Sequence, residues 1–515
     1  MQAADRVLAE VGDARSRARS PVRSLVLQER LARALPLGIT LLTIGAIAIR
    51  EVADPDIWWH LATGRYISAE RRIPAFDVFS FTATSHRWVT HEWLSDFLLY
   101  GGYRLVGLAG LMFFFALVIC AAFALVYWRC HSRPFVAACS VLMAAVACNM
   151  TWGVRPQMFS LLFASVYLYI LEGADPGSSR RVWLLPPLTL LWANLHSSFV
   201  AGLVIIAVFA LGQQAEWLAR RTSTGPFLAP STRRLALVGL GSLVCSLVTP
   251  NGIQAAIFPF GTLSNHLIQA NIEEWFSPDF HKPLAWPLAV YWLALLAVMA
   301  VSRRRVSVTQ LILLVGTAAA SLYSMRHVPF FSLVGAPILA QQTEGLRSEP
   351  SAARRARPWP PVLRAVLAGS LAVLVVAVGA RVYVVHQRMP AVEQALYPAA
   401  ALAYMQEHDL SGRVFNTYHW GGYLIWHGYQ VFIDGRAELY GDEVLRQYLQ
   451  AYGVQAEWER PLLDNGIDVV LIESSSRLAM LLKESGRWEA AYQDALASVF
   501  VPVRPTAVRA ATGAS

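Results

Sequence analysis

The chain has 515 residues, of which 56% are hydrophobic and only 15% are charged, and its net charge is +9. A soluble protein of this length needs more charged surface, so the composition excludes an ordinary soluble fold. The basic excess does not indicate nucleic-acid binding, because the arginines recur along the chain as anchors beside a membrane do.

Apolar runs near the length of a bilayer crossing recur along most of the chain. A helix needs roughly 20 apolar residues to span the hydrocarbon core. The runs predict a multi-pass α-helical membrane protein with about eleven transmembrane helices, although several are short and 182–217 allows another division. The predicted spans are residues 35–49, 106–128, 134–152, 157–171, 182–195, 197–217, 235–250, 286–301, 306–323, 329–341 and 363–385.

The arginines predict the orientation of these spans. The first 33 residues contain seven arginines, which places the N-terminus in the cytoplasm by the positive-inside rule. Every second loop is basic from there on, so we expect an N-in/C-out protein of a bacterial cytoplasmic membrane, with the first span kept as an anchor. All five cysteines lie in or beside spans, so neither a disulfide framework nor a cysteine metal site is predicted.

The sequence divides into three predicted parts. Residues 1–33 form a basic cytoplasmic N-terminus, residues 34–385 a membrane domain with a first external loop at 50–105, and residues 386–515 an external, periplasmic tail. The tail is net acidic and alternates β-like with helical patterns, which predicts a small α/β domain. Its expected strands are 413–417, 431–434 and 468–472, and its expected helices are 443–452 and 477–484.

Two carboxylates follow the first span directly, in the sequence Asp54-Pro55-Asp56-Ile57-Trp58-Trp59-His60. Acids so close to the hydrocarbon are costly unless they are used or paired, which favours a general base or a pair of ligands for a divalent cation such as magnesium or manganese. Alternatively, Asp54 caps a helix at about 57–69. For Trp58 and Trp59 we favour anchoring at the membrane interface.

The same external loop contains further polar candidates, namely His60, Asp77, His91 and Glu92. His91 and Glu92 open a helical stretch that leads to the second span. They either orient a substrate or form a second acid/base pair, or Glu92 merely interacts with the helix dipole; these alternatives stay open.

Polar side chains also gather at predicted external ends of later spans. Each one alone has a structural interpretation, such as a cap, a turn or a snorkelling arginine. Membrane-level polar residues are functional candidates by default, and their common side indicates one external cavity. These candidates are Arg155, Asn194, His196, Glu273, Glu274, Arg326 and His327.

Two motifs in the tail are candidates for ligand contacts. Trp420 and Tyr423 flank two glycines at an expected strand-to-helix junction, which can offer backbone donors and stacking surfaces to a sugar or peptide. Asp434 and Arg436 end an expected buried strand, where they either contact a ligand or pair to brace the domain.

Together these features resemble the GT-C superfamily, membrane glycosyltransferases that use polyprenyl-phosphate-linked sugars. The pattern Asp54-x-Asp56…His60-Leu61…Gly64-Arg65…Ile73-Pro74…Asp77 is similar to the first loop of oligosaccharyltransferase and protein mannosyltransferase relatives. The segment Trp420-Gly421-Gly422-Tyr423 is similar in place to their tail motif, but Gly421 stands where the family has an acceptor-reading aspartate. A second Asp-x-Asp is missing, with Glu273 and Glu274 the nearest substitute, which leaves metal dependence open.

The resemblance implies an inverting glycosyltransferase that faces the exterior. Asp54 or Asp56 is then the base that activates the acceptor, whether protein, glycan or lipid, and Arg155 and Arg326 bind the lipid phosphate. Glu92, His91 and His196 orient acceptor or sugar. One rival is a lipid or glycan flippase or transporter, which the one-sided polarity disfavours. Another is an inactive relative that serves as a scaffold.

Overall fold

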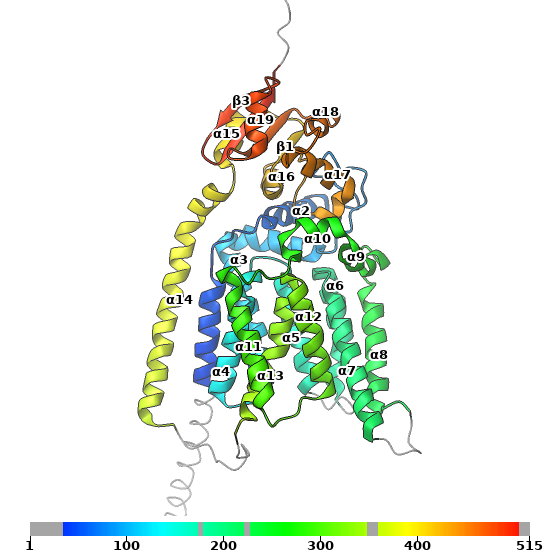
Figure 1. Ribbon diagram of the computed structural model, residues 1–515, viewed down its shortest axis with the longest axis vertical. Coiled ribbons are helices and arrows are strands. Elements are labelled where there is room, and N and C mark those ends of the chain that lie inside the picture. Colours follow the sequence, from blue (N-terminus) through cyan, green and yellow to red (C-terminus); the bar gives the residue numbers. More distant parts are fainter. Residues whose placement is uncertain (1–33, 174–178, 221–226, 348–358, 504–515) are drawn as a thin grey trace, which may run out of the picture.

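A helical bundle carries a small α/β tail at one end (Figure 1). The computed structural model describes residues 34–173, 179–220, 227–347 and 359–503. The predicted basic N-terminus, 1–33, lies outside the described residues, as do parts of three predicted inner loops.

Each predicted span corresponds to a helix. Among the described residues, five helices are long and apolar enough to cross a membrane, namely α3, α4 with the turn that follows it, α7, α11 with the turn before it, and α14. The others are shorter. The helices are Ala34–Ala48, α3 (Trp93–Arg129), α4 (Pro134–Cys148), α5 (Gln157–Gly173), α6 (Leu185–Leu195), α7 (Phe199–Arg220), α8 (Pro230–Ser246), α11 (Trp286–Val301), α12 (Val308–Tyr323), α13 (Val328–Glu344) and α14 (Pro361–Leu396).

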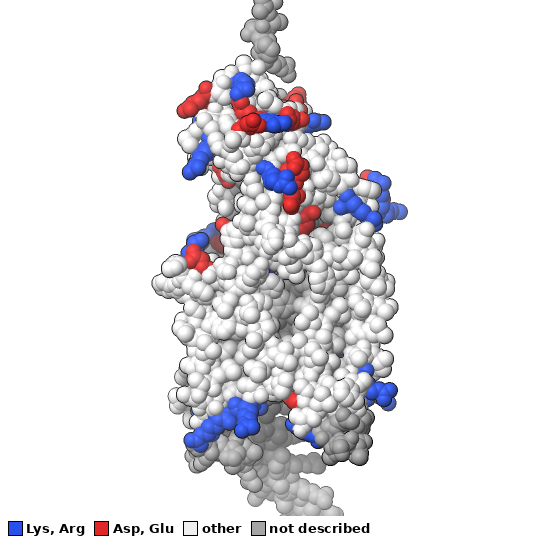
Figure 2. Space-filling model, turned by 45° about the vertical axis from the view of Figure 1, so that its right-hand side comes forward, with Lys and Arg blue, Asp and Glu red and all other residues white. Residues whose placement is uncertain are grey.

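Charged side chains avoid the middle of the molecule. In Figure 2 a broad, almost uncharged band separates a basic lower end from an upper end that carries both signs. This is the distribution of a protein whose band lies in lipid, where charge is costly.

Helix α3 combines a surface helix with a membrane helix. Gly107 interrupts it with φ 65° and ψ −173°, a conformation that a residue with a side chain rarely adopts. The break coincides with the predicted start of the second span at 106. Residues before it therefore belong to the external loop, which begins with α2 (Asp56–Glu70) close to the predicted 57–69.

Short helices cap the external end of the bundle. They include α9 (Ile253–Ser264) and α10 (His266–Asn271), which lie between α8 and α11, and several 3-10 turns. The turns at this end are Asn149–Thr151, Glu273–Trp275, Pro283–Ala285 and Met325–His327, whereas Arg180–Leu184 lies between α5 and α6 at the opposite end and Tyr418–Trp420 belongs to the tail.

The tail is built on a four-stranded mixed sheet with the order β1-β2-β4-β3. Strand β1 pairs parallel with β2, and β4 pairs antiparallel with β2 and β3. Its elements are α15 (Ala399–Glu407), β1 (Val414–Asn416), α16 (Gly421–Trp426), α17 (Ala437–Tyr452), α18 (Arg460–Asp464), β2 (Val469–Glu473), α19 (Arg477–Glu484), β3 (Trp488–Gln493) and β4 (Ala497–Pro502).

The expected strand at 431–434 is wrong. Val431 makes only single parallel bridges, to Val414 of the tail and to Ser80 of the first external loop. The Phe432 N–H donates to the Val414 carbonyl and to Asn416 Oδ1 (3.0 Å each), and Asn416 Nδ2 donates to the Ile433 carbonyl (2.8 Å), so a side chain takes over the pairing beyond Val431. The segment thereby links the external loop to the tail instead of adding a strand.

Candidate functional site

The acid pair lies where the chain passes from the helix Ala34–Ala48 into α2, which begins at Asp56. Asp54 Oδ1 accepts a hydrogen bond from the Asp56 N–H at 3.0 Å, so Asp54 fixes the first residue of α2 although Pro55 holds the N-cap position. The two carboxylates are therefore held next to one another at the external end of the bundle.

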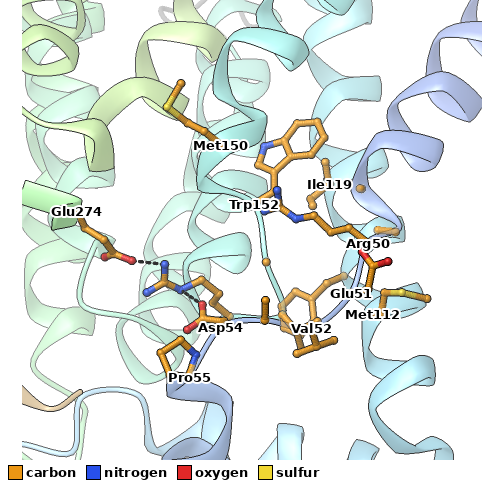
Figure 3. A pocket seen from close by; sticks show the side chains of 17 residues that line it. Arg50, Glu51, Val52, Asp54, Pro55, Met112, Ile119, Met150, Trp152 and Glu274 are labelled. Atoms are coloured by element: carbon orange, nitrogen blue, oxygen red, sulfur yellow. Dashed lines mark hydrogen bonds and ion pairs between the residues drawn. The ribbon is translucent and has the colours of Figure 1, made fainter. Parts of the chain in front are cut away.

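One guanidinium connects three carboxylates here. Arg155, from the turn between α4 and α5, places Nε 2.6 Å from Asp54 Oδ2 and Nη2 3.5 Å from Asp56 Oδ2. Its Nη1 bonds to Glu274, which comes from the external segment before α11 (Figure 3). Residues from three distant parts of the sequence thus form one charge cluster.

The carboxylates of this cluster differ in proton affinity. Burial raises the pKa of Asp56 to about 7, and the negative charge of Asp54 adds to the shift. Burial raises the pKa of Asp54 as well. Burial alone would also raise that of Glu274, but Arg155 and Arg326 lower it to about 2. Glu274 is therefore the ionised partner of Arg155, while Asp56 titrates near neutral pH.

A cavity of about 440 Å³ opens beside Asp54 (Figure 3). Its polar wall includes Asp54, Arg50 and Arg155, and its apolar wall is one face of α3. The α3 residues are Met112, Phe115, Ala116 and Ile119, spaced as neighbours on a helix. The cavity therefore joins a charged end to an apolar slot that runs toward the membrane.

Arg50 is a site residue that the sequence analysis missed. Its Nη1 donates to the Asn149 carbonyl at 3.1 Å, and no carboxylate of the described chain lies within ion-pairing distance. The sequence does contain a signal for Arg50. By the positive-inside rule arginine is disfavoured at the predicted external end of a span, so an arginine there, just before an acidic motif, is a candidate functional residue.

Four predicted residues from three segments of the chain meet in a second, buried cluster. Glu92 Oε1 lies 3.2 Å from His196 Nε2 and 3.7 Å from His91 Nε2, and its Oε2 lies 3.9 Å from His60 Nε2. His60 Nδ1 is 2.6 Å from Asp96 Oδ1. Each imidazole therefore turns Nε2 toward the same carboxyl group.

The remaining ring nitrogens fix the tautomers of two of these histidines. His196 Nδ1 accepts from the Ser198 N–H at 3.0 Å, which leaves the proton on Nε2, facing Glu92. His91 Nδ1 instead donates to the Val89 carbonyl at 3.1 Å, so its Nε2 is an acceptor. Glu92 therefore faces one protonated Nε2, that of His196, and one unprotonated Nε2, that of His91.

Burial determines the protonation of this cluster. It raises the pKa of Glu92 to about 8 and lowers that of His91 to about 4. It also lowers the pKa values of His60 and His196. A neutral Glu92 among neutral imidazoles results near pH 7.

Arg326 lies between the two clusters. Its Nε is 3.6 Å from Glu274 Oε2, its guanidinium lies 4.8 Å from the ring centre of Trp275, and its charge acts on Glu92. His327 packs near Trp275 as well. Glu273 is exposed and outside both clusters, so only one acid of the predicted Glu273-Glu274 pair takes part.

Asn194 supports the second cluster from below. Its Oδ1 accepts from Trp93 Nε1 at 2.8 Å and its Nδ2 donates to the Val248 carbonyl at 3.0 Å. Asn194 thus links the last turn of α6 to the start of α3 and to the residues just after α8.

The tail covers the acid pair with glycines. A Cβ on Gly435 would overlap the Asp56 carboxylate, and one on Gly422 would lie 3.0 Å from the Pro55 carbonyl. Larger residues at these places would push the tail away from α2.

The aromatic residues of the tail motif pack within the protein. Trp58 lies edge-on to Tyr423 at 5.1 Å, and Trp420 Nε1 donates to the Leu396 carbonyl at 2.9 Å. Trp58 and Trp59 are buried beneath the tail, so the expectation that they anchor the chain at the lipid interface is wrong. Contact with α16 excludes them from lipid.

Asp77, Asp434 and Arg436 form a buried brace. Arg436 donates to both oxygens of Asp434 (2.8 and 2.6 Å) and to Asp77 Oδ1 (2.8 Å). The brace joins the first external loop to the tail, as the pairing alternative for Asp434 and Arg436 expects.

Asp54, Asp56 and Glu274 do not form a cation site as they are arranged. No three His, Cys, Asp or Glu residues in the described part of the chain are grouped to hold a metal ion. Arg155 lies between Asp54, Asp56 and Glu274 and is close to all three carboxylates. Its guanidinium supplies the neutralising charge instead.

No protein-family model and no curated protein matches the chain. Among solved structures it is similar to ArnT from Cupriavidus metallidurans bound to undecaprenyl phosphate, with TM-score 0.47 and 13% identity over 90% of this chain and 96% of that one. It is also similar to the arabinofuranosyltransferase AftD from Mycobacteria, with TM-score 0.43 and 13% identity over 92% of this chain but 40% of AftD.

With TM-scores below 0.5, the likeness is one of general arrangement and carries no donor, acceptor or reaction to this chain. Within the described residues, the chain has helices long and apolar enough to cross a membrane and a small C-terminal mixed sheet.

Proposed function

We propose that the chain is a membrane glycosyltransferase that moves a sugar from a polyprenyl-phosphate-linked donor to an acceptor on the external side of the membrane. The observation that supports this most is the acid pair Asp54 and Asp56, both paired with Arg155, of which Asp54 and Arg155 line the charged end of a cavity with an apolar wall. A lipid-linked phosphate sugar has the same sequence of parts: a polar sugar, an anionic phosphate and an apolar chain.

The donor phosphate is placed at Arg50. Arg155 is already engaged by three carboxylates, whereas Arg50 donates only to a carbonyl and lines the same cavity. An arginine with free donors suits a phosphate. The polyprenyl chain then follows Met112, Phe115 and Ile119, an apolar strip about 10 Å long at 1.5 Å per helical residue. In this proposal Arg326 is a second cation, farther from the donor phosphate than Arg50.

Asp56 is the proposed general base. Asp54 is the closer partner of Arg155 and faces the cavity, while Asp56 is held more loosely and is the more exposed of the two. A carboxylate with a pKa of about 7 is both available and basic enough to accept a proton near neutral pH.

The proposed reaction is a single displacement. The acceptor oxygen or nitrogen attacks the anomeric carbon as its proton passes to Asp56, and the bond from that carbon to the phosphate oxygen breaks. The lipid phosphate leaves with the electron pair beside Arg50 and Arg155, which stabilise its charge. Attack opposite the leaving group inverts the anomeric configuration.

Glu92 and its histidines take a supporting part in this proposal. They are buried, so Glu92 acts on Asp56 through its protonation state and through packing rather than by contact with the acceptor. A neutral Glu92 keeps a further negative charge away from Asp56, which limits the rise of the pKa of Asp56.

The proposal includes an orientation. With about eleven crossings, a cytoplasmic N-terminus and an external tail, both clusters face the periplasm of a bacterial cytoplasmic membrane. The acceptor, whether protein, glycan or lipid, then arrives from that side.

The test is transfer from polyprenyl-phosphate sugars by the full chain in proteoliposomes. Asp56→Asn and Asp54→Asn should abolish release of polyprenyl phosphate, whereas Asp279→Asn, an exposed external carboxylate, should not. Full transfer by normally folded Asp54 and Asp56 variants would refute the proposal. Movement of the intact donor across the vesicle without transfer would favour the flippase.

A further inference from the structure

Helix α9 carries an apolar face that nothing in the described chain covers. Its twelve residues, Ile253–Ser264, include no charged side chain. Ile253, Ile257 and Phe260 follow the i, i+4, i+7 spacing of one helix face and are 64%, 58% and 58% exposed. A surface helix in water would carry polar residues there.

The opposite side of α9 is fixed against the candidate site. Ala255 is buried, and the ring of Phe258 stacks on that of His91 with centres 4.3 Å apart. His91 is the direct neighbour of Glu92. The orientation of α9 is thus set by contacts with the buried cluster, and the apolar face points outward as a result.

The exposed face continues the apolar surface of a bundle helix. Leu240, Leu243, Val244 and Val248 are exposed along α8 and just beyond it, and α9 begins a few residues later across the outer end of α8 (Figure 1). An outward apolar row on a helix of an integral membrane protein faces lipid. The face of α9 extends that row at the end of α8.

The other flank of this segment has the chemistry of a water-facing surface. Asn265 Nδ2 donates to Asp442 Oδ1 at 2.9 Å, beside His266 and Arg446, in a polar groove toward the tail. Trp286, at the start of α11, is 56% exposed, as expected for an aromatic residue at the headgroup level. Polarity therefore changes from apolar to polar across α9 and α10.

We propose that α9 is an interfacial helix, seated with Ile253, Ile257 and Phe260 in the boundary between headgroups and acyl chains of the external leaflet. Such helices bury their apolar face to a depth of about 5–10 Å. Through Phe258 and His91, the membrane surface then supports the Glu92 cluster from one side. This inference does not depend on the reaction proposed above.

The experiment places the photoreactive residue p-benzoylphenylalanine at position 257 of the full chain in phosphatidylethanolamine/phosphatidylglycerol vesicles. A second variant carries it at position 260, in case the first does not fold, and the control carries it at His266, which is exposed in the polar groove. After irradiation, mass spectrometry should find phospholipid adducts at 257 and 260 at a yield several-fold above that at 266.

Two results would overturn the proposal. Adducts of twice the mass of the chain at 257 and 260 would assign the face to a second copy. Lipid adducts no more frequent at 257 and 260 than at 266 would place α9 in water. The Asp56→Asn variant should give the same adducts as the native chain, which separates this result from the fate of the proposed reaction.

Discussion

Asp54 and Asp56 are two residues apart, yet their surroundings prepare them for different tasks. Asp54 is held by Arg155 at 2.6 Å and by the N–H at the start of α2, while Asp56 lies 3.5 Å from Arg155 and burial raises its pKa to about 7. Sequence alone suggests an acid pair but cannot assign these tasks, because the difference comes from Arg155 and Glu274, which are about 100 and 220 positions away in the chain.

The first prediction is a pH dependence. Asp56 must be ionised to act as a base, so the transfer rate should rise through pH 7 and fall about tenfold per pH unit well below it. Asp56→Asn should lower the rate by about 10²–10⁴ and remove this limb. Initial rates of polyprenyl phosphate release between pH 5 and 9 measure it. A limb that survives in Asp56→Asn would contradict the assignment.

The second prediction concerns stability at Glu92. Its pKa is about 8 in the folded chain against 4.5 for an unperturbed glutamate, so the folded state holds the proton more tightly. The stability that this contributes is fully present below pH 4.5 and is lost as the pH rises through 8. Each unit of such a difference corresponds to about 1.4 kcal/mol.

Glu92→Gln mimics the neutral acid and should therefore be more stable than the native chain at pH 9, with little difference at pH 4. Thermal unfolding in detergent measures it, and the exposed Glu407→Gln is the control. A native chain that equals or exceeds Glu92→Gln at pH 9 would show that Glu92 is ionised and paired in the folded protein.

At the scale of elements, the segment 431–436 joins the tail to the first external loop. Its bridge to Ser80, its brace to Asp77 and the contact of Gly435 with Asp56 all lie within six residues. The sequence made this segment look like a strand because Val431, Phe432 and Ile433 are apolar and buried. Their burial serves contact with the loop rather than a ladder.

The third prediction tests that contact. Gly435→Ala would place a methyl group on the Asp56 carboxylate, so transfer should fall at least about tenfold, with an overpacking cost of about 1–3 kcal/mol. Gly101→Ala, where a Cβ meets nothing within 4 Å, should have little effect on either. The transfer rates and melting temperatures of both variants test this prediction. Native activity in Gly435→Ala would mean that the tail does not rest on Asp56.

The fourth prediction concerns the brace. Arg436→Met would leave Asp77 and Asp434 buried without a cation, at a cost of about 3–5 kcal/mol. Arg436→Lys should not restore it, because one ammonium cannot reproduce the bonds to both carboxylates. Both variants should open 71–92 to proteases. An unchanged stability in Arg436→Met would contradict a stabilising role for the brace.

At the scale of the molecule, periodicity and arginine placement predicted the helices well. Hydrophobic length and charge are local properties of a span, and each predicted run corresponds to a helix. Which polar residues meet is decided by packing between distant segments, so Arg50 and Asp96 were missed as site residues. Trp58, Trp59 and Trp420 were predicted to face lipid or ligand and instead pack inside.

The proposed function also explains why the polar candidate residues lie at one end of the bundle. Two clusters, one cavity and a tail that covers them all lie at the external end, and the membrane helices supply the apolar wall. Under the proposed function, a lipid-linked donor would enter along the apolar wall of the cavity, and the acceptor would arrive from the side of the tail. The central claim is therefore that the cavity beside Arg50 binds a polyprenyl phosphate.

Native mass spectrometry of the purified full chain, titrated with a polyprenyl phosphate, tests this claim most directly. The account predicts a bound polyprenyl phosphate that phosphatidylglycerol does not displace, and binding about tenfold or more weaker in Arg50→Gln, as loss of a charge-assisted contact implies. Lys282→Gln, at an exposed external position, should bind like the native chain. Equal binding by Arg50→Gln, or displacement by phosphatidylglycerol, would contradict it.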